Sequence, residues 1–282
     1  MPELPDLVYV ERQLRDQVQG AVVQSVAVGD PTPLRIMTSG SFSTQLEGKR
    51  LETIDRRGHF LRFGFSQDLV MVVNAMLVGR YTLGPGPAAK PPKSLVFALR
   101  FEGGQELRYL DAKRMGKVYL TLCADEASIP GYGELGMEVL SEDFTRERFS
   151  SLVKGRREQV RTFLMDKRTL ASIGNAYADE ILFAAGLHPK TFCYQLSDED
   201  RFRLYDSIRA TLVHAINHIA QVGPDVSEKL RDFLKVRGRS GQPCEVCGTT
   251  LRSVRVGPAD ADFCPRCQPA RRALFIDWSR TS

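Results

Sequence analysis

The sequence predicts an α+β protein in which an N-terminal antiparallel β-sandwich with a leading helix precedes a helical domain and a cysteine-bearing β-hairpin. Three observations support this fold class. Short β-rich runs fill residues 22–122, helical patterns fill residues 144–236, and two close cysteine pairs stand near the C-terminus. Strand and helix patterns are segregated along the chain and do not alternate, which is typical of α+β rather than α/β proteins.

The length of 282 residues suggests two domains, with a boundary in an irregular stretch that contains Pro and Gly. We place the linker at residues 131–142. The sandwich, which would be the catalytic domain of an enzyme, then covers residues 1–130. The helical domain covers residues 143–236, and the cysteine-bearing tail covers residues 237–282.

The first predicted element is a helix over residues 6–18. Apolar side chains recur on one of its faces, at Leu7, Val10, Leu14 and Val18. Pro5 suits the first turn, where a missing N–H costs nothing. Pro2 and Glu3 then lie just outside a helix N-terminus, whose positive dipole end favours a bound anion.

Runs rich in β-branched and aromatic residues predict the strands of the sandwich. The clearest runs are residues 60–65, 69–73, 95–101 and 107–110. The pair Gly103-Gly104 stands between the last two runs and predicts a hairpin. Residues 84–92 are rich in Pro, Gly and Ala, so we expect a loop there.

Two cysteine pairs of the form Cys-x2-Cys predict a metal site. Cys244 and Cys247 are separated from Cys264 and Cys267 by 16 residues, a spacing that suits one structural zinc ion at the ends of a β-hairpin. Four thiolate ligands leave no open position for catalysis, so residues 237–282 are expected to be a zinc finger. The solitary Cys123 and Cys193 are expected to be buried thiols.

Composition excludes several classes of protein. No apolar run reaches the roughly 18 residues of a membrane span, and the N-terminus lacks the regions of a secretory signal. We therefore expect a cytoplasmic protein. The net charge of +5 is uneven, since residues 1–150 carry −1 and residues 151–282 carry +6. The basic second half suits a polyanion such as nucleic acid, or it is simply a solvated charged face.

The N-terminus itself has the composition of a nucleophilic site. A small second residue such as Pro2 normally permits removal of the initiator methionine, which leaves a secondary amine. Such an amine can attack a carbon at the aldehyde oxidation level and form an iminium. Glu3 beside it could transfer protons. On these two residues alone, a terminus with no chemical role is the better explanation of the pattern.

A second motif covers residues 173–183, Ile-Gly-Asn-Ala-Tyr-Ala-Asp-Glu-Ile-Leu-Phe. Gly174-Asn175 predicts a turn that enters a helix with Asn175 near the N-cap. Exposed N–H groups at that position could hold a backbone phosphate. The alternative is a capped core helix without a ligand.

Together the three motifs resemble the formamidopyrimidine-DNA glycosylase and endonuclease VIII family. That family starts with Pro-Glu-Leu-Pro, carries Gly-Asn-x-Tyr-Ala-Asp-Glu in a helix–two-turn–helix element, and ends in a four-cysteine zinc finger. Further similar segments are Arg57-Gly58, Gly79-Arg80, residues 111–116 and residues 236–239. The resemblance spans nearly the whole chain in the right order and indicates an atypical member.

The resemblance implies a base-excision repair enzyme, a bifunctional DNA glycosylase and abasic-site lyase. Such an enzyme flips a damaged nucleotide out of the duplex. Pro2 would attack the sugar and form a Schiff base, and Glu3 would act as general acid and base. Asn175 and Arg161 match positions that grip the DNA backbone. We expect a monomer that binds damaged DNA and, in a bacterium, associates with the nucleoid.

Several residues depart from the family pattern. His59 stands where the family has a catalytic lysine, and histidine is only partly charged near neutral pH. Ala259 stands where the zinc hairpin carries an arginine, and Arg255 could replace it only if the hairpin register differed. Aspartates at positions 260 and 262 would repel a phosphate. These changes put the elimination chemistry in doubt.

The residues that would enter the duplex are also changed. Leu77 stands at the position of an apolar wedge, and the segment Lys113-Arg114-Met115 replaces an arginine and an aromatic residue with side chains of similar reach. Insertion into the base stack therefore stays plausible. Residues 223–239 form a short segment. The resemblance implies that family members which cover an oxidised purine carry a longer loop here. The short segment therefore argues against the branch that excises oxidised guanine and favours a pyrimidine-type or atypical branch.

Two alternatives remain open at this point. The first is a catalytically weakened protein of the same fold that binds lesions or abasic DNA, which His59 and Ala259 motivate. The second is a zinc-ribbon protein that binds RNA, in which Pro2 has no role. The sequence names neither the preferred lesion nor the preferred strandedness of the substrate.

Overall fold

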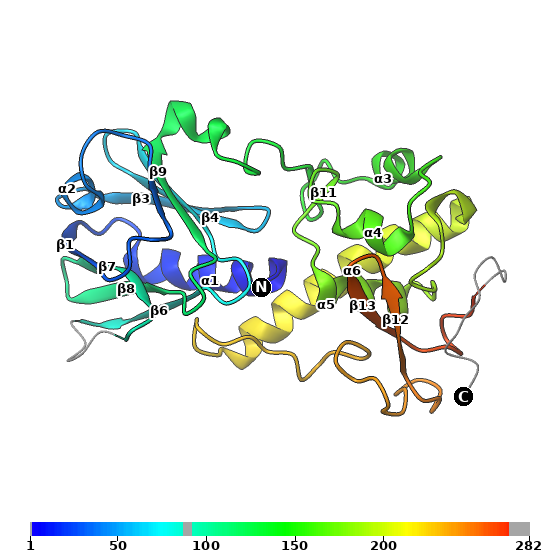
Figure 1. Ribbon diagram of the computed structural model, residues 1–282. Helices are drawn as coiled ribbons and strands as arrows, with labels where there is room; N and C mark the ends of the chain where they lie inside the picture. The colour runs from blue at the N-terminus through cyan, green and yellow to red at the C-terminus, as the bar shows by residue number, and fades with distance from the viewer. Residues whose placement is uncertain (1, 87–91, 271–282) are drawn as a thin grey trace. The chain divides into compact units, whose positions relative to one another are not determined.

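The structure is a computed structural model that describes residues 2–86 and 92–270 (Figure 1). The chain forms two compact units. The first unit comprises Met1–Leu135 and Ile216–Leu230, and the second unit comprises Gly136–Ala215 and Arg231–Ser282. The units therefore do not follow chain order, because a short segment after residue 215 belongs with the N-terminal region.

The first unit contains one long helix and two sheets. The helix α1 covers Leu4–Val18, and a short helix α2 covers Phe42–Leu46. The sheet with order β1-β7-β8-β6 consists of Val23–Val28, Leu95–Phe101, Gln105–Leu110 and Arg80–Pro85. The sheet with order β2-β9-β5-β4-β3 consists of Leu34–Ile36, Lys117–Leu122, Leu69–Asn74, Phe60–Phe65 and Leu51–Arg57.

Both sheets contribute to one apolar core, which confirms the predicted sandwich. Phe63 and Met71 from one sheet share this core with Phe97 and Leu107 from the other. Helix α1 adds the apolar face predicted for it: Leu7, Val10, Leu14 and Val18. Nearly every pairing is antiparallel, and β7 and β8 form the hairpin predicted around Gly103-Gly104. The exception is the parallel pairing of the short strand β2 with β9.

Two expectations for the first unit were wrong. Gly84 and Pro85 belong to strand β6 and not to a loop, because β6 continues along β8 to the pair Pro85–Gln105. The rest of the expected loop, residues 87–91, lies outside the described residues. Cys123 is exposed, because it begins the 3-10 turn Cys123–Ser128 beyond the end of β9. Its Sγ accepts a hydrogen bond from Arg62 at 3.5 Å.

The second unit is mainly helical. Its helices are α3 (Arg146–Val153), α4 (Val160–Met165), α5 (Asn175–Ala184) and the start of α6 (Asp198–Val222). A 3-10 turn covers Cys193–Gln195, where Cys193 is buried as expected. The short strands β10 (Met137–Glu138) and β11 (Leu170–Ala171) pair in parallel, and β12 (Arg252–Val256) and β13 (Ala259–Phe263) form an antiparallel hairpin.

The expected helical pattern up to residue 236 was too long. Helix α6 ends at Val222, and residues 223–236 form turns without helix or strand. Gly223 has a φ of +64°, and Pro224 follows it. A left-handed glycine followed by proline is a strong helix stop, because proline cannot continue the hydrogen-bond ladder. Within the described residues, no helix is long and apolar enough to cross a membrane.

Candidate functional site

The first candidate site is the start of α1, which holds Pro2 and Glu3. Glu3 is the N-cap residue, and its backbone N–H donates to the Asp6 carboxylate at 2.8 Å. The Leu7 N–H donates to the Glu3 carbonyl at 3.1 Å and begins the helical ladder. Pro2 is buried, and Glu3 is only 7% exposed. The terminus is therefore held in place by the helix that it precedes, as predicted.

His59 lies in the same unit, in a two-residue turn between β3 and β4. Arg57 pairs with Phe60 across the turn, and Gly58 has a φ of +58°. Such turns need positive φ at their first central residue, which explains the glycine. A Cβ at Gly58 would also lie 2.7 Å from the Leu135 side chain. The His59 ring is buried, with its centroid 4.3 Å from that of Phe60.

Leu77 and the segment Lys113-Arg114-Met115 lie on two loops of the first unit. Leu77 is 50% exposed. In the other loop the buried Asp111 carboxylate accepts hydrogen bonds from the Lys113 N–H at 3.1 Å and the Gly116 N–H at 2.6 Å. These bonds fix the backbone and leave the Lys113 and Arg114 side chains exposed.

Both loops depend on one buried side chain, Tyr109, which the sequence analysis missed. A Cβ at Gly79 would lie 2.3 Å from the Tyr109 hydroxyl, and a Cβ at Gly116 would lie 2.1 Å from it. Burial, and secondarily the Asp111 carboxylate, raises the pKa of Tyr109 well above its usual range, so the hydroxyl stays neutral. The only sequence signal was the presence of a glycine in each loop.

Asn175 and Arg161 lie in the second unit, at the start of α5 and on α4. Gly174 is the N-cap of α5 and Asn175 its first helical residue, so Asn175 lies near the N-cap as expected. Arg161 is only 1% exposed and donates to the Asn175 Oδ1 at 2.9 Å. This contact turns the amide so that its NH₂ donors are available for another acceptor.

The carboxylates of Asp179 and Glu180 organise the second unit, and the sequence analysis did not single them out. Asp179 is fully buried and accepts from Arg161 at 2.7 Å, from Arg237 at 2.8 Å and from the Asp262 N–H at 3.1 Å. Burial raises the pKa of Asp179, although both guanidinium groups oppose this shift. The predicted motif thus joins α5 to the hairpin.

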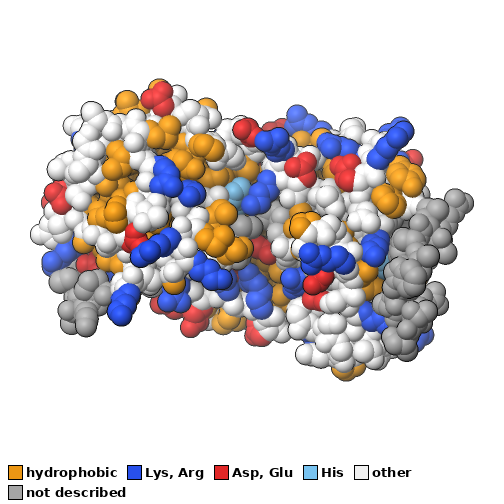
Figure 2. Space-filling view, viewed as in Figure 1, with side chains coloured by type: hydrophobic (Ala, Val, Ile, Leu, Met, Phe, Trp, Pro, Cys, Tyr) orange, Lys and Arg blue, Asp and Glu red, His pale blue; other side chains and the backbone are white. Residues whose placement is uncertain are grey.

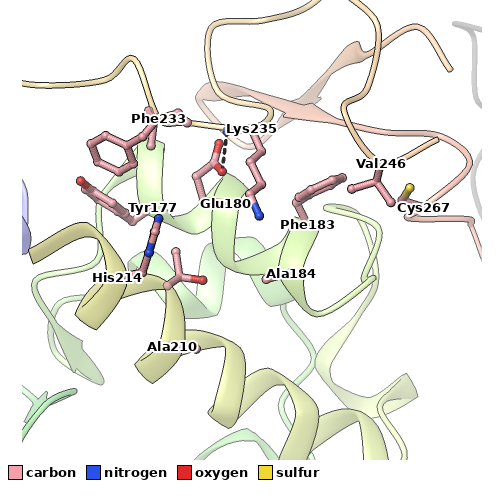
Figure 3. A pocket seen from close by; sticks show the side chains of 12 residues that line it. Tyr177, Glu180, Phe183, Ala184, Ala210, His214, Phe233, Lys235, Val246 and Cys267 are labelled. Carbon is pink, nitrogen blue, oxygen red and sulfur yellow. Dashed lines mark hydrogen bonds between the residues drawn. The ribbon is translucent and has the colours of Figure 1, made fainter. Parts of the chain in front are cut away.

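Glu180 binds the segment that precedes the zinc finger. Its two carboxylate oxygens accept from the backbone N–H groups of Lys235, Val236 and Arg237, each at 2.9 Å. Figure 3 shows the bond to Lys235 beside a cavity of about 440 Å³. Aromatic side chains line much of this cavity: Tyr177, Phe183 and Phe233. None of Arg161, Asn175 and Arg255 lines it.

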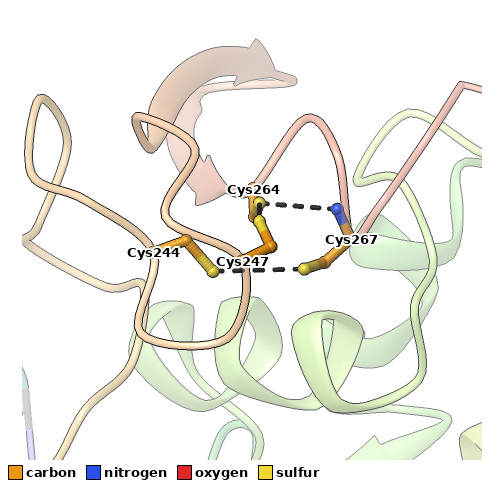
Figure 4. Close-up of side chains that lie close together, drawn as sticks. All are labelled: Cys244, Cys247, Cys264 and Cys267. Carbon is orange, nitrogen blue, oxygen red and sulfur yellow. Dashed lines mark hydrogen bonds between the residues drawn. The ribbon is translucent and has the colours of Figure 1, made fainter.

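The four cysteines meet as predicted (Figure 4). Their sulfur atoms all lie within 4.8 Å of one another, with Cys247 to Cys264 at 3.4 Å and Cys244 to Cys267 at 4.0 Å. A tetrahedral zinc with Zn–S bonds of about 2.3 Å places its sulfur ligands about 3.8 Å apart. The four thiols therefore fit one structural zinc ion.

The hairpin of β12 and β13 shows what surrounds Ala259. Gly257-Pro258 forms the turn, so Val256 pairs with Ala259 and Arg255 pairs with Asp260. Paired residues share one face of a strand pair and successive residues alternate. Arg255 therefore points to the face opposite Ala259, and its guanidinium lies 3.4 Å from the Asp260 carboxylate.

The second aspartate of this hairpin does not face solvent, contrary to the expected repulsion. Asp262 is only 7% exposed. Its carboxylate accepts from the Gly238 N–H at 2.8 Å and from the Ser253 hydroxyl. Figure 2 shows Lys and Arg side chains spread over the visible face of each unit, with Asp and Glu among them.

Three family models match the chain in succession. The formamidopyrimidine-DNA glycosylase N-terminal domain matches residues 1–118, and the helix–two-turn–helix domain of the same enzymes matches residues 135–223. The zinc finger found in these glycosylases and in isoleucyl-tRNA synthetases matches residues 241–270. The matches account for the sandwich, the helices and the cysteine cluster.

Curated relatives are similar over nearly their full length. A formamidopyrimidine-DNA glycosylase of Symbiobacterium thermophilum is 33% identical, with 98% of this chain and 92% of the relative covered. That of Moorella thermoacetica is 34% identical, with 90% and 95% covered. The Lactococcus lactis enzyme, solved with DNA containing an abasic site, has a TM-score of 0.85 at 25% identity, with 95% and 100% covered.

Proposed function

The chain belongs to the formamidopyrimidine-DNA glycosylase family, and we propose that Pro2 is its nucleophile and Glu3 its proton-transfer group. The protein is a base-excision repair DNA glycosylase with abasic-site lyase activity that binds damaged DNA and carries one structural zinc ion. The comparisons do not favour a weakened lesion-binding protein, and a zinc-ribbon RNA-binding protein does not fit them.

The reaction begins with attack by the neutral Pro2 nitrogen on C1′ of the damaged nucleotide. The bond from C1′ to the base breaks, and the base leaves with a proton. The sugar ring then opens: the C1′–O4′ bond breaks, O4′ takes a proton, and C1′ and the Pro2 nitrogen form an iminium. The iminium withdraws electrons, so loss of a C2′ proton expels the 3′ phosphate by β-elimination. A following δ-elimination expels the 5′ phosphate. Glu3 gives and takes the protons of these steps.

The position of the terminus on α1 is the observation that carries this proposal. A helix N-terminus favours negative charge nearby and disfavours positive charge, so it opposes protonation of the Pro2 amine. The hydrogen bond from the Glu3 N–H to the Asp6 carboxylate fixes the backbone at Glu3, directly after Pro2. A nucleophile and a proton carrier held this rigidly avoid much of the entropic cost of the reaction.

DNA binding divides between the two units. We propose that Leu77, Lys113, Arg114 and Met115 fill the space of the flipped nucleotide, since their loops are rigid and their tips accessible. Asn175 presents its amide NH₂ to a phosphate. Because Arg161 is buried and bonded to Asn175, its contribution is to orient that amide. We assign the exposed Arg255 an auxiliary phosphate contact.

His59 takes the position of the family lysine in this proposal. A protonated imidazole can donate a charged hydrogen bond to the phosphate beside the lesion, as a lysine does. The His59 ring packs against the Phe60 ring, with centroids 4.3 Å apart, which restricts its position. The compact segment 223–239 supports pyrimidine-type lesions as preferred substrates, and we propose a cytoplasmic, nucleoid-associated location.

Borohydride trapping on DNA with a natural abasic site tests the nucleophile. Reduction fixes only an amine that has formed a Schiff base. The wild type, once its initiator methionine has been removed, should therefore become covalently attached to the DNA. Pro2→Gly keeps a primary amine and should retain some trapping. A tag left on the N-terminus should abolish it. Trapping that survives the blocked terminus would identify a lysine as the nucleophile.

A panel of oligonucleotides then defines the substrate. The same duplex should carry an oxidised pyrimidine, a ring-opened purine or an oxidised guanine, each in duplex, bubble and single-stranded form. We expect the fastest excision for the oxidised pyrimidine. Faster excision of the oxidised guanine would contradict the lesion preference and leave the glycosylase assignment intact.

A further inference from the structure

Arg237 is the residue from which a further binding role can be derived. It follows the turns of residues 223–236 and precedes the zinc finger. Its backbone N–H donates to Glu180 at 2.9 Å, and the next N–H, that of Gly238, donates to Asp262 at 2.8 Å. Because both acceptors are buried carboxylates, the backbone on either side of the Arg237 side chain is held firmly.

The Arg237 guanidinium is anchored through one nitrogen only. Its Nη1 donates to the Asp179 Oδ2 and to the Asp260 backbone carbonyl, both at 2.8 Å. These two bonds use both hydrogens of that nitrogen. Asp179 belongs to α5 and Asp260 to β13, so the guanidinium sits where the helix and the hairpin meet.

The other side of the guanidinium is available. Among the described residues, Nε and Nη2 of Arg237 have no acceptor, and the side chain is 31% exposed. Arg161 differs, because its Nε and Nη2 are bonded to Asp179, Asn175 and the Asp260 carbonyl and the residue is buried. An arginine edge with two parallel N–H donors matches the two oxygens of a phosphate.

We propose that Nε and Nη2 of Arg237 bind one backbone phosphate of the DNA. This inference rests on the proposed function, since it assumes that the second unit contacts the DNA backbone. Asp179 is shared by Arg161 and Arg237, and the Asp262 carboxylate lies 3.9 Å from the Arg237 Nη1, so two carboxylates balance the two arginines. The proposal therefore rests on the two available donors of Arg237 and not on an excess of charge. Arg237 and Asn175 are the two accessible ends of this hydrogen-bonded network.

The test is the salt dependence of binding to a duplex with a tetrahydrofuran abasic analogue, which cannot form an iminium. Removing one phosphate contact should lower the slope of log K against log salt by about one. We expect this loss for Arg237→Gln. Arg237→Lys should keep the slope but bind more weakly, because lysine has the charge and lacks the two-donor edge.

Arg146→Gln is the matched control. It removes the same charge from α3, where the two-donor edge of Arg146 is already occupied by Asp206 at 2.7–3.1 Å. Its slope should equal that of the wild type. Zinc content and thermal unfolding should be measured for each variant, because a purely structural role of Arg237 would change these and leave the slope intact.

The outcomes separate this inference from the proposed function. A wild-type slope for Arg237→Gln, or an equal loss for Arg146→Gln, overturns the phosphate contact. Wild-type trapping on a natural abasic site would still support the glycosylase in that case. A wild type that neither traps nor binds the analogue would overturn the proposed function and this inference together.

Discussion

Polar groups are held by contacts between near neighbours in the chain at the start of α1. At the junction between α5 and the zinc finger they are held by contacts between distant segments. In the first, Glu3 and Asp6 are bonded at a separation of three residues. In the second, Asp179 reaches Arg161 over 18 residues and Asp262 over 83, and Glu180 reaches Val236 over 56. Local polar contacts are visible in a sequence motif, whereas distant ones appear only after folding.

The largest effect is expected from the metal that maintains the distant contacts. Cys264→Ser should release zinc and unfold the tail, because structural zinc binding supplies about 10–16 kcal/mol to such domains. The hairpin would then lose its contact with Asp179, and DNA binding should fall sharply. Metal analysis and the affinity for abasic-analogue DNA measure both effects. Full zinc content in the variant would contradict the four-cysteine assignment.

A change at the start of α1 should lower the rate of catalysis and leave the stability of the fold unchanged. Glu3→Gln should lower base excision by about 10²–10⁴-fold, the usual contribution of a positioned proton-transfer group. The Glu3 side chain also accepts from the Asp6 N–H in a capping box, and glutamine keeps an oxygen for that contact, so DNA affinity and thermal stability should stay near wild type. Single-turnover kinetics measure the rate of base excision, and an unchanged rate would remove Glu3 from the mechanism.

Asp179→Asn breaks the distant network at its centre. The change leaves the buried Arg161 without its carboxylate, and breaking a buried ion pair this way costs about 3–5 kcal/mol. Denaturant unfolding should show this loss, and Asn175 should lose its fixed orientation. Asp16→Asn, a change on the surface of α1, serves as the control. A loss below about 1 kcal/mol would show that the network is not needed for folding.

Gly116→Ala tests how a loop of the first unit packs on the buried Tyr109. A Cβ there would lie 2.1 Å from the Tyr109 hydroxyl, and overpacking of this kind costs about 1–3 kcal/mol. Adding Tyr109→Phe removes the hydroxyl and should restore most of the lost stability. If the double variant is no more stable than Gly116→Ala, the clash is not the cause.

The smallest effect concerns His59. An imidazole contributes a positive charge only when protonated, so activity should decline where rising pH removes the proton from His59. His59→Lys should flatten the decline, since lysine keeps its charge to much higher pH. His59→Ala should lower activity a few-fold and remove this component. One shared pH profile and rate for wild type and His59→Ala would make His59 a structural residue.

Much of the protein could be predicted because its signals are local. The apolar period of α1, the glycine pair between β7 and β8, and the spacing of the four cysteines each involve neighbours in the chain. The residues carrying the family resemblance are likewise short motifs. The predicted end of α6 was wrong, although its signal is also local, because Gly223 and Pro224 stop the helix.

The sequence by itself determined the fold class, the family and the four cysteines of the zinc site, and it predicted Pro2 and Glu3 as the nucleophile and the proton-transfer group. Only the tertiary structure decided that Arg161 is buried, that Arg255 faces away from Ala259, and that Arg237 keeps two donors available. The physical reason is that the role of an arginine depends on which acceptors surround it. Those acceptors come from segments up to 99 residues away, as between Arg161 and Asp260.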